Sequence, residues 1–190
     1  MKKIIITVCL FFSLIGFTQD LKQPSEGKSM VYFTRSSALG MLINFKYFDG
    51  ENYLGKFNYG KYLAYECEPG KHLFWVKAEN FDFVEAELEA GKIYIIDAEP
   101  QMGAFKSAVK FVPFDNNPES YKDEKKYQKK KKLIVDSILK NKEYTLSEED
   151  YKDEKKYDLD DVIKKGIEKY NKKVEEGFVF AKMTSEMNYQ

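Results

Sequence analysis

Histidine and cysteine, which often hold metals or act in nucleophilic catalysis, are nearly missing from this sequence. Its 190 residues include one histidine, His72, and two cysteines, Cys9 and Cys67. A metal site needs about three or four ligands, so carboxylates would have to supply most of them here. A catalytic Cys–His pair normally needs a third group and a cleft. We therefore expect no metal, no cofactor, no catalytic residues and no enzymatic activity.

A surplus of positive charge is also missing. The 31 Lys and Arg residues equal the 31 Asp and Glu residues, so the formal net charge is zero. Nucleic-acid binders rely on a basic surface, and this balance predicts no nucleic-acid partner. Lys129 to Lys132 form a run of four lysines, but neighbouring acids offset its charge. We interpret the run as a solvated helix face, with contact to an anionic envelope lipid or glycan as the alternative.

No apolar run reaches the about 20 residues that span a bilayer as a helix. The longest, Ile4 to Phe17, follows two lysines, as in a secretory signal peptide. Small residues precede Gln19, so we expect residues 1–18 to be cleaved there, an uncleaved anchor being the alternative. Cys9 lies inside the run rather than at its end, which argues against a lipid anchor. We expect an exported protein that is periplasmic, envelope-associated or secreted, with no membrane span in the mature chain.

After a short polar linker, residues 19–28, short runs of aromatic and β-branched residues continue to residue 115. Turn signals such as Asp49-Gly50 separate the runs, and acidic and apolar residues alternate from Phe83 to Glu89. This pattern predicts a mainly β domain over residues 29–115, an antiparallel Ig-like or prealbumin-like β-sandwich. The expected strands are residues 30–35, 41–48, 53–58, 61–67, 72–78, 83–89, 92–98 and 107–114.

Charged residues dominate the chain after this domain and predict a C-terminal helical extension over residues 117–176. Asn117, before a proline, marks one helix start, and Thr145 or Ser147 marks another, Ser147 forming a capping-box pattern with Asp150. Apolar residues at helical spacing from Leu159 to Val174 give the second helix a packing face. We expect the two helices to pair as a helical hairpin on the sandwich, with self-association through them as a further hypothesis. The tail, residues 177–190, is expected to form an edge strand or a clasp.

The stretch CEPGKH, Cys67 to His72, brings the only histidine close to the one cysteine that the mature chain would keep. It could be a nucleophile with its base, half of a metal site, or a turn. Pro69-Gly70 suits the centre of a type II turn, and both flanks have strand patterns. We therefore predict a turn with Cys67 buried and unbridged. Strand alternation places His72 on the inner side with Phe74 and Val76.

Three side chains are candidates for a binding surface. Trp75 and Tyr65 belong to an aromatic-rich domain, and exposed rings of this kind stack on sugars. Packing between strands is the competing and favoured interpretation of both. Arg35 ends the first expected strand, where it would bind an anion or form a salt bridge at the rim of the domain.

Four motifs carry a resemblance to a known family. They are Val31-Tyr32-Phe33 with Arg35, Tyr53-Leu54-Gly55, Pro69-Gly70-Lys71-His72, and Ala90-Gly91-Lys92 with Tyr94. Their order resembles an exported bacterial domain family of unknown function, numbered 2846, over residues 29–114, and the turn is similar to that of PEGA-type modules. Ser36 stands where the family often has proline. The resemblance implies an envelope location and a sandwich fold, and it supplies no catalytic residues.

These observations predict a non-enzymatic cell-envelope protein that acts as a binding or interaction module. Its partner would be an unknown envelope protein or a surface polymer. One alternative is a carbohydrate-binding module that uses surface aromatics. Another is a hydrolase whose carboxylate site the sequence does not reveal.

Overall fold

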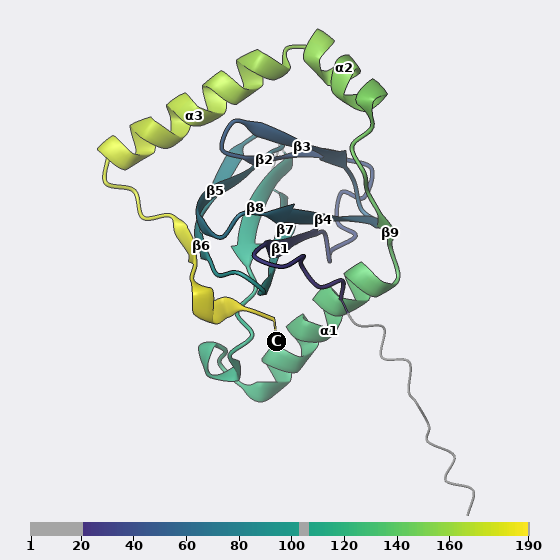
Figure 1. Cartoon of the computed structure of the whole chain (residues 1–190), viewed down its shortest axis with the longest axis vertical. Helices are drawn as coiled ribbons and strands as arrows, with labels where there is room; N and C mark the ends of the chain where they lie inside the picture. The colour runs from purple at the N-terminus through teal and green to yellow at the C-terminus, as the bar shows by residue number, and fades with distance from the viewer. Residues whose placement is uncertain (1–20, 103–106, 190) are drawn as a thin grey trace, which may run out of the picture.

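The computed structural model of the chain describes residues 21–102 and 107–189. The expected signal peptide, its cleavage site and Cys9 lie outside these residues. In the described part, two five-stranded sheets face each other and helices cover their outer sides (Figure 1).

The strands follow most of the expected segments closely. They are β1 (Ser29–Thr34), β2 (Phe45–Asp49), β3 (Asn52–Phe57), β4 (Lys61–Cys67), β5 (Gly70–Lys77), β6 (Phe81–Leu88), β7 (Ile93–Met102), β8 (Ser107–Pro113), β9 (Lys142–Glu143) and β10 (Ala181–Met183). The segment 41–44 was expected to open β2 but lies in the loop before it. Strand β7 continues through the turn expected at Glu99-Pro100, and β9 was not expected.

The two sheets are mixed, so the expected purely antiparallel sandwich is wrong in this respect. Sheet A has the order β8-β7-β1-β4-β9, and sheet B has the order β10-β6-β5-β2-β3. Strand β1 runs parallel to β7, β4 to β9, and β10 to β6. The alternation of residues indicates which side of a strand is buried, but it does not encode the direction of the neighbouring strand.

Aromatic side chains from both sheets fill the space between them. Phe33 of β1 meets Phe74 of β5 edge-on at 5.3 Å between ring centroids and stacks on Phe111 of β8 at 5.7 Å. One edge is joined across the sheets, because the Asn80 side chain exchanges hydrogen bonds of 2.8 and 2.7 Å with the backbone of Val109. The core is therefore closed on that side rather than open to a ligand.

Three α-helices follow the sandwich: α1 (Glu124–Leu139), α2 (Glu148–Lys156) and α3 (Leu159–Glu175). Helix α1 begins later than expected. Pro118 starts only a short 3-10 turn, η1 (Pro118–Ser120), and the Asp123 side chain caps α1 by accepting from Lys126 N at 2.8 Å. Ser147 caps α2 as expected, accepting from Asp150 N at 3.0 Å. The chain then turns at Asp158, whose φ is +75°, so α2 and α3 are separate helices.

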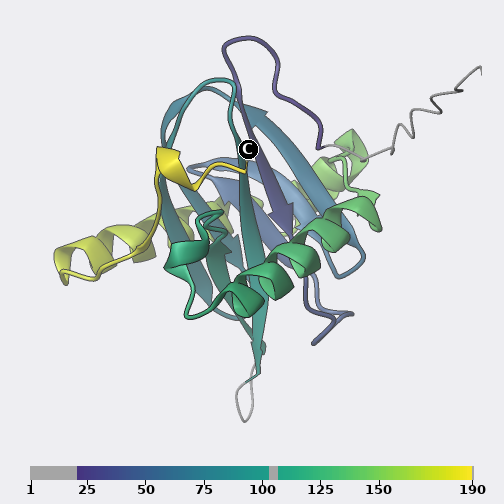
Figure 2. The ribbon, with the colours of Figure 1, turned by 90° about the horizontal axis from the view of Figure 1, so that it is seen from below.

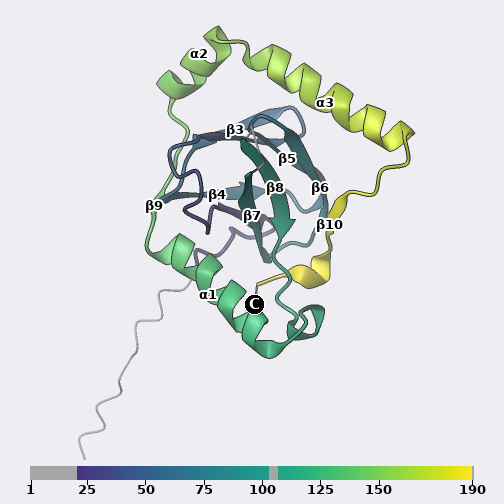
Figure 3. The same cartoon turned by 180° about the vertical axis from the view of Figure 1, so that it is seen from behind.

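The expected helical hairpin is wrong, because α1 and α3 cover opposite sheets. Ile134 and Ile138 of α1 pack with Tyr32 on the outer side of sheet A. Leu159 of α3 packs with Trp75 on the outer side of sheet B. Figures 1 and 3 show the helices on opposite sides of the sandwich, and Figure 2 shows α1 lying across the strands from below. An apolar helix stripe requires a partner surface but does not specify which one.

The tail joins sheet B as the edge strand β10, where Met183 is buried, and a second 3-10 turn, η2 (Ser185–Met187), follows it. None of the described helices is long and apolar enough to cross a membrane.

Candidate functional site

The CEPGKH stretch links two strands, as predicted, but through a bend at Pro69 rather than the expected type II turn, and it carries the chain from one sheet to the other. Cys67 ends β4 in sheet A, and Gly70 begins β5 in sheet B. Gly70 has a φ of +115°, a conformation that side-chain-bearing residues rarely adopt. Glycine at this position therefore allows the chain to leave one sheet and enter the other within a few residues.

Both ring nitrogens of His72 form hydrogen bonds that stabilise this connection. Nδ1 lies 2.8 Å from Asp49 Oδ2, and Nε2 lies 2.8 Å from the carbonyl oxygen of Glu68. Because a carboxylate and a carbonyl both accept, both nitrogens must donate, which makes the ring an imidazolium. The hydrogen bond to Asp49 raises the pKa of His72 and outweighs its burial. The ring also stacks on Phe74, on the inner side as expected.

Cys67 is not set up as a nucleophile. Its side chain is buried, and burial, the largest cause, raises its pKa to about 12. A reactive cysteine needs a lowered pKa or an adjacent base, and both nitrogens of His72 are already hydrogen-bonded. Cys67 and His72 therefore have structural roles in the connection between β4 and β5. In the described part of the chain, no group of three or more His, Cys, Asp and Glu residues could hold a metal ion.

The three candidate binding residues do not come together, and none presents a surface for a ligand. Trp75 has no exposed area; its Nε1 donates to Gly50 O at 2.7 Å. Tyr65 is half-buried and donates to Asp49 Oδ2 at 3.1 Å. Arg35 is fully buried and holds the loop before β2. Stacking of sugars on Trp75 is excluded in this structure.

Two members of the lysine run are not solvated as expected. Lys131 is half-buried and donates to Asn116 Oδ1 at 3.1 Å and to the Tyr127 hydroxyl at 3.0 Å. Lys130 turns toward sheet A and forms ion pairs of 2.6 Å with Asp97 and with Glu99. Asp97 has no exposed area and also accepts from the backbone N of Ser36 at 2.8 Å. Burial lowers the pKa of Lys130, but the two carboxylates outweigh it and raise that pKa. This contact fixes α1 on the sheet and leaves the lysine no role in binding.

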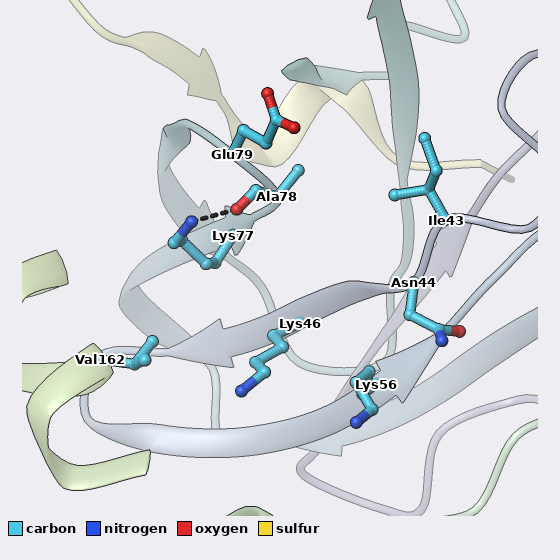
Figure 4. Close-up of a pocket in the computed structure, with 8 residues that line it drawn as sticks. All are labelled: Ile43, Asn44, Lys46, Lys56, Lys77, Ala78, Glu79 and Val162. Carbon is cyan, nitrogen blue, oxygen red and sulfur yellow. Dashed lines mark hydrogen bonds between the residues drawn. The ribbon is translucent and has the colours of Figure 1, made fainter. Parts of the chain in front are cut away.

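A different set of lysines forms a row across three neighbouring strands. Lys46 of β2 lies directly opposite Lys56 of β3 on one side and Lys77 of β5 on the other. All three belong to the outer side of sheet B, because their neighbours Tyr47, Phe57 and Val76 face the core. They line a pocket of about 330 Å³, whose other lining residues are Ile43, Asn44, Ala78, Glu79 and Val162 (Figure 4). We call these three residues the lysine row.

The lysine row is electrostatically unfavourable on its own, because like charges directly opposite each other destabilise a sheet. Glu154 of α2 relieves part of this, with ion pairs to Lys46 at 2.5 Å and to Lys56. Lys77 forms no ion pair within the described residues, and its ammonium donates to the carbonyl of Ala78. Burial, and then the charges of Lys46 and Lys169, lower the pKa of Lys77. The local potential is therefore positive.

Two other pockets are less suited to a defined chemistry. The larger, about 570 Å³, lies between β5, β6 and the tail, and its charged lining residues are of both signs. The smaller is lined by Asp150, Asp153 and Glu154, but its volume of about 100 Å³ holds only a few water molecules. The hydrolase hypothesis gains no substrate-sized acidic cleft from this pocket.

The lysine row was missed in the sequence because its members are far apart in the chain and only strand register brings them together.

Compared with known proteins, the chain matches no family model, no curated protein and no solved structure.

Proposed function

We propose that this chain is an exported, non-enzymatic module of the cell envelope that binds an anionic group of its partner at the lysine row. The observation that carries the proposal is the direct opposition of Lys46 to both Lys56 and Lys77. Three ammonium groups at directly paired positions of adjacent strands repel one another and do not stabilise the sheet. An anion bound among them would remove their repulsion, as a carboxylate already does for two of them.

The charges around the pocket leave room for such an anion. Lys46, Lys56 and Lys77 line it, and Lys169 is close enough to lower the pKa of Lys77. The opposing carboxylates are Glu79, which lines the pocket, and Glu154. Three lysines and one carboxylate line the pocket itself, so positive charge exceeds negative charge there, whereas Asp150 and Asp153 line the neighbouring pocket beyond Lys56. Because Glu154 pairs with Lys46 and Lys56, Lys77 is the member of the row without a carboxylate partner in the described residues, and its ammonium donates only to the carbonyl of Ala78.

A binding titration with soluble polyphosphate tests the proposal. We expect binding that weakens with salt and falls about fivefold or more in Lys77→Gln. Glu154→Gln should act in the opposite direction and strengthen binding, because it releases two lysines from their internal carboxylate. Lys132→Gln, an exposed lysine on α1, is the matched control. Equal losses in Lys77→Gln and Lys132→Gln would show nonspecific attraction and defeat the proposal.

Export and the resemblance to family 2846 are the other parts of the proposal. The charged and apolar start of the chain and the order of the four motifs support them. Cell fractionation of the full chain should find it in the envelope or medium, and deletion of residues 2–18 should retain it in the cytoplasm. A purified protein that turned over a substrate, and lost that activity in His72→Ala, would contradict the non-enzymatic assignment.

A further inference from the structure

An uncharged apolar loop projects beside the lysine row. The loop, residues 36–44, connects β1 to β2 and contains no charged residue. Leu39, Met41 and Leu42 are 46%, 50% and 83% exposed. Single exposed apolar residues are common, but three within four positions form a patch with a function to explain. In Figure 2 the segment between β1 and β2 extends past the end of β1, on the side where β7 and β8 reach farther still.

The shape of this loop is fixed by a buried charge. The Arg35 guanidinium donates to the carbonyl oxygens of Leu39 at 2.9 Å, Gly40 at 2.5 Å and Ile43. It also lies 4.2 Å from the centre of the Phe45 ring. Burying an arginine is costly unless its donors find partners, and here three of them bind carbonyl oxygens of the loop. These hydrogen bonds hold the loop in one conformation. The exposed apolar side chains are thus presented by a rigid support.

The loop and the lysine row form one continuous surface. Ile43 and Asn44, at the end of the loop, line the same pocket as Lys46, Lys56 and Lys77 (Figure 4). Lys46 is near the start of β2, whereas Lys56 and Lys77 are near the ends of β3 and β5. Because β2 is antiparallel to both, all three lysines lie at the end of sheet B from which the loop emerges.

We propose that this surface docks on an anionic lipid bilayer, with Leu39, Met41 and Leu42 entering the headgroup boundary and the lysine row contacting phosphate groups. The inference rests on the proposed function and specifies its partner. A projecting apolar loop needs no complementary pocket in a bilayer, whereas a soluble polymer offers it no apolar phase. Cations beside the inserted residues match the negative surface potential of anionic lipids. Each signal is weak alone, and together they give reversible attachment.

Vesicle flotation tests this inference with the full chain. We expect binding to phosphatidylcholine vesicles that contain phosphatidylglycerol, and little binding to phosphatidylcholine alone. Leu42→Ser should reduce vesicle binding about tenfold and leave polyphosphate binding unchanged. Lys77→Gln should reduce both. Val179→Ser is the matched control, because Val179 is 82% exposed and lies in the tail.

The outcomes separate this inference from the proposed function. Polyphosphate binding without vesicle binding would overturn the lipid assignment and leave the anion site intact; a protein pocket for the loop would give this result. If the wild-type protein bound neither polyphosphate nor vesicles, both proposals would be overturned. Vesicle binding that Leu42→Ser and Val179→Ser reduce equally would also overturn the inference. Because the Leu42 side chain is almost fully exposed, its replacement leaves the fold unchanged and the comparison valid.

Discussion

Gly166 of α3 lies directly on the indole ring of Trp75. A Cβ atom at position 166 would be 2.5 Å from Cη2 of the ring and 2.8 Å from Cζ3, closer than any real contact. The ring has little room to move, because it stacks on Phe48 at 3.7 Å between ring centroids and its Nε1 donates to Gly50 O. The absence of a side chain at Gly166 therefore allows α3 to approach sheet B this closely.

This contact predicts an unusual sign for Gly166→Ala. In a helix interior the change normally stabilises a protein by about 0.5–1 kcal/mol. Here the added methyl group overlaps a fixed ring, and we expect the free energy of unfolding to fall by about 1–3 kcal/mol. Urea unfolding of the two proteins measures this change in the free energy of unfolding. Asn171→Ala, at an exposed position of α3, should change stability by less than about 0.5 kcal/mol. A more stable Gly166→Ala protein would show that α3 does not rest on Trp75.

The same contact shows how far the sequence predicts the fold. Alternation correctly placed His72 on the inner side of β5 with Phe74 and Val76, and the structure puts Trp75 on the opposite side. It did not reveal that α3 would cover that side, because an apolar helix stripe fits any apolar surface. The expectation of two helices paired with each other failed for this reason.

Two further features depended on long-range contacts. The segment 41–44 has strand-like composition, but the Arg35 side chain holds the carbonyls at positions 39, 40 and 43 in a loop. The lysine row exists only through the register of β2 with β3 and β5. By contrast, the Ser147 cap depends on neighbouring residues, and its local sequence was sufficient to predict it. The local sequence at Pro69-Gly70 indicated a change of direction between two strands, but not that the second strand would join the other sheet.

His72 should titrate above its ordinary pKa of 6.5, because its charged form donates to Asp49 and to the Glu68 carbonyl. It is the only histidine of the chain, so its ring resonances in an NMR titration are assigned without mutation. Asp49→Asn should bring the midpoint back toward 6.5 or below, since the main stabilising partner is lost while burial remains. A wild-type midpoint below 6.5 would contradict the imidazolium assignment.

The raised pKa of His72 also predicts how stability depends on pH. The folded protein holds this proton more tightly than the unfolded chain, so the stabilisation is complete below about pH 6.5. It is lost progressively as the pH rises from 6.5 through the folded-state pKa. His72→Gln should remove this part of the decline in the free energy of unfolding. Equal slopes for both proteins over that interval would rule out the linkage.

Cys67 should be unreactive until the protein unfolds. Its thiol is buried and its pKa is raised to about 12, so almost no thiolate is present at pH 8. In a Cys9→Ser background, we expect Ellman's reagent to label no thiol in the native state and one after denaturation in urea. Rapid labelling of the native protein would place Cys67 at an accessible surface instead.

Lys130 and Lys132 are close in sequence but should differ strongly when each is replaced by methionine. Lys130→Met leaves the fully buried Asp97 without its cation, although the Thr34 side chain and the backbone N of Ser36 still donate to it. Removing one partner of a buried pair typically costs about 3–5 kcal/mol, and these remaining donors place the expected loss near the lower end. Lys132 makes only an exposed pair with Asp136, so Lys132→Met should cost less than about 0.5 kcal/mol. Urea unfolding at neutral pH gives both values. Similar small losses in the two variants would show that α1 is not anchored to sheet A through Asp97.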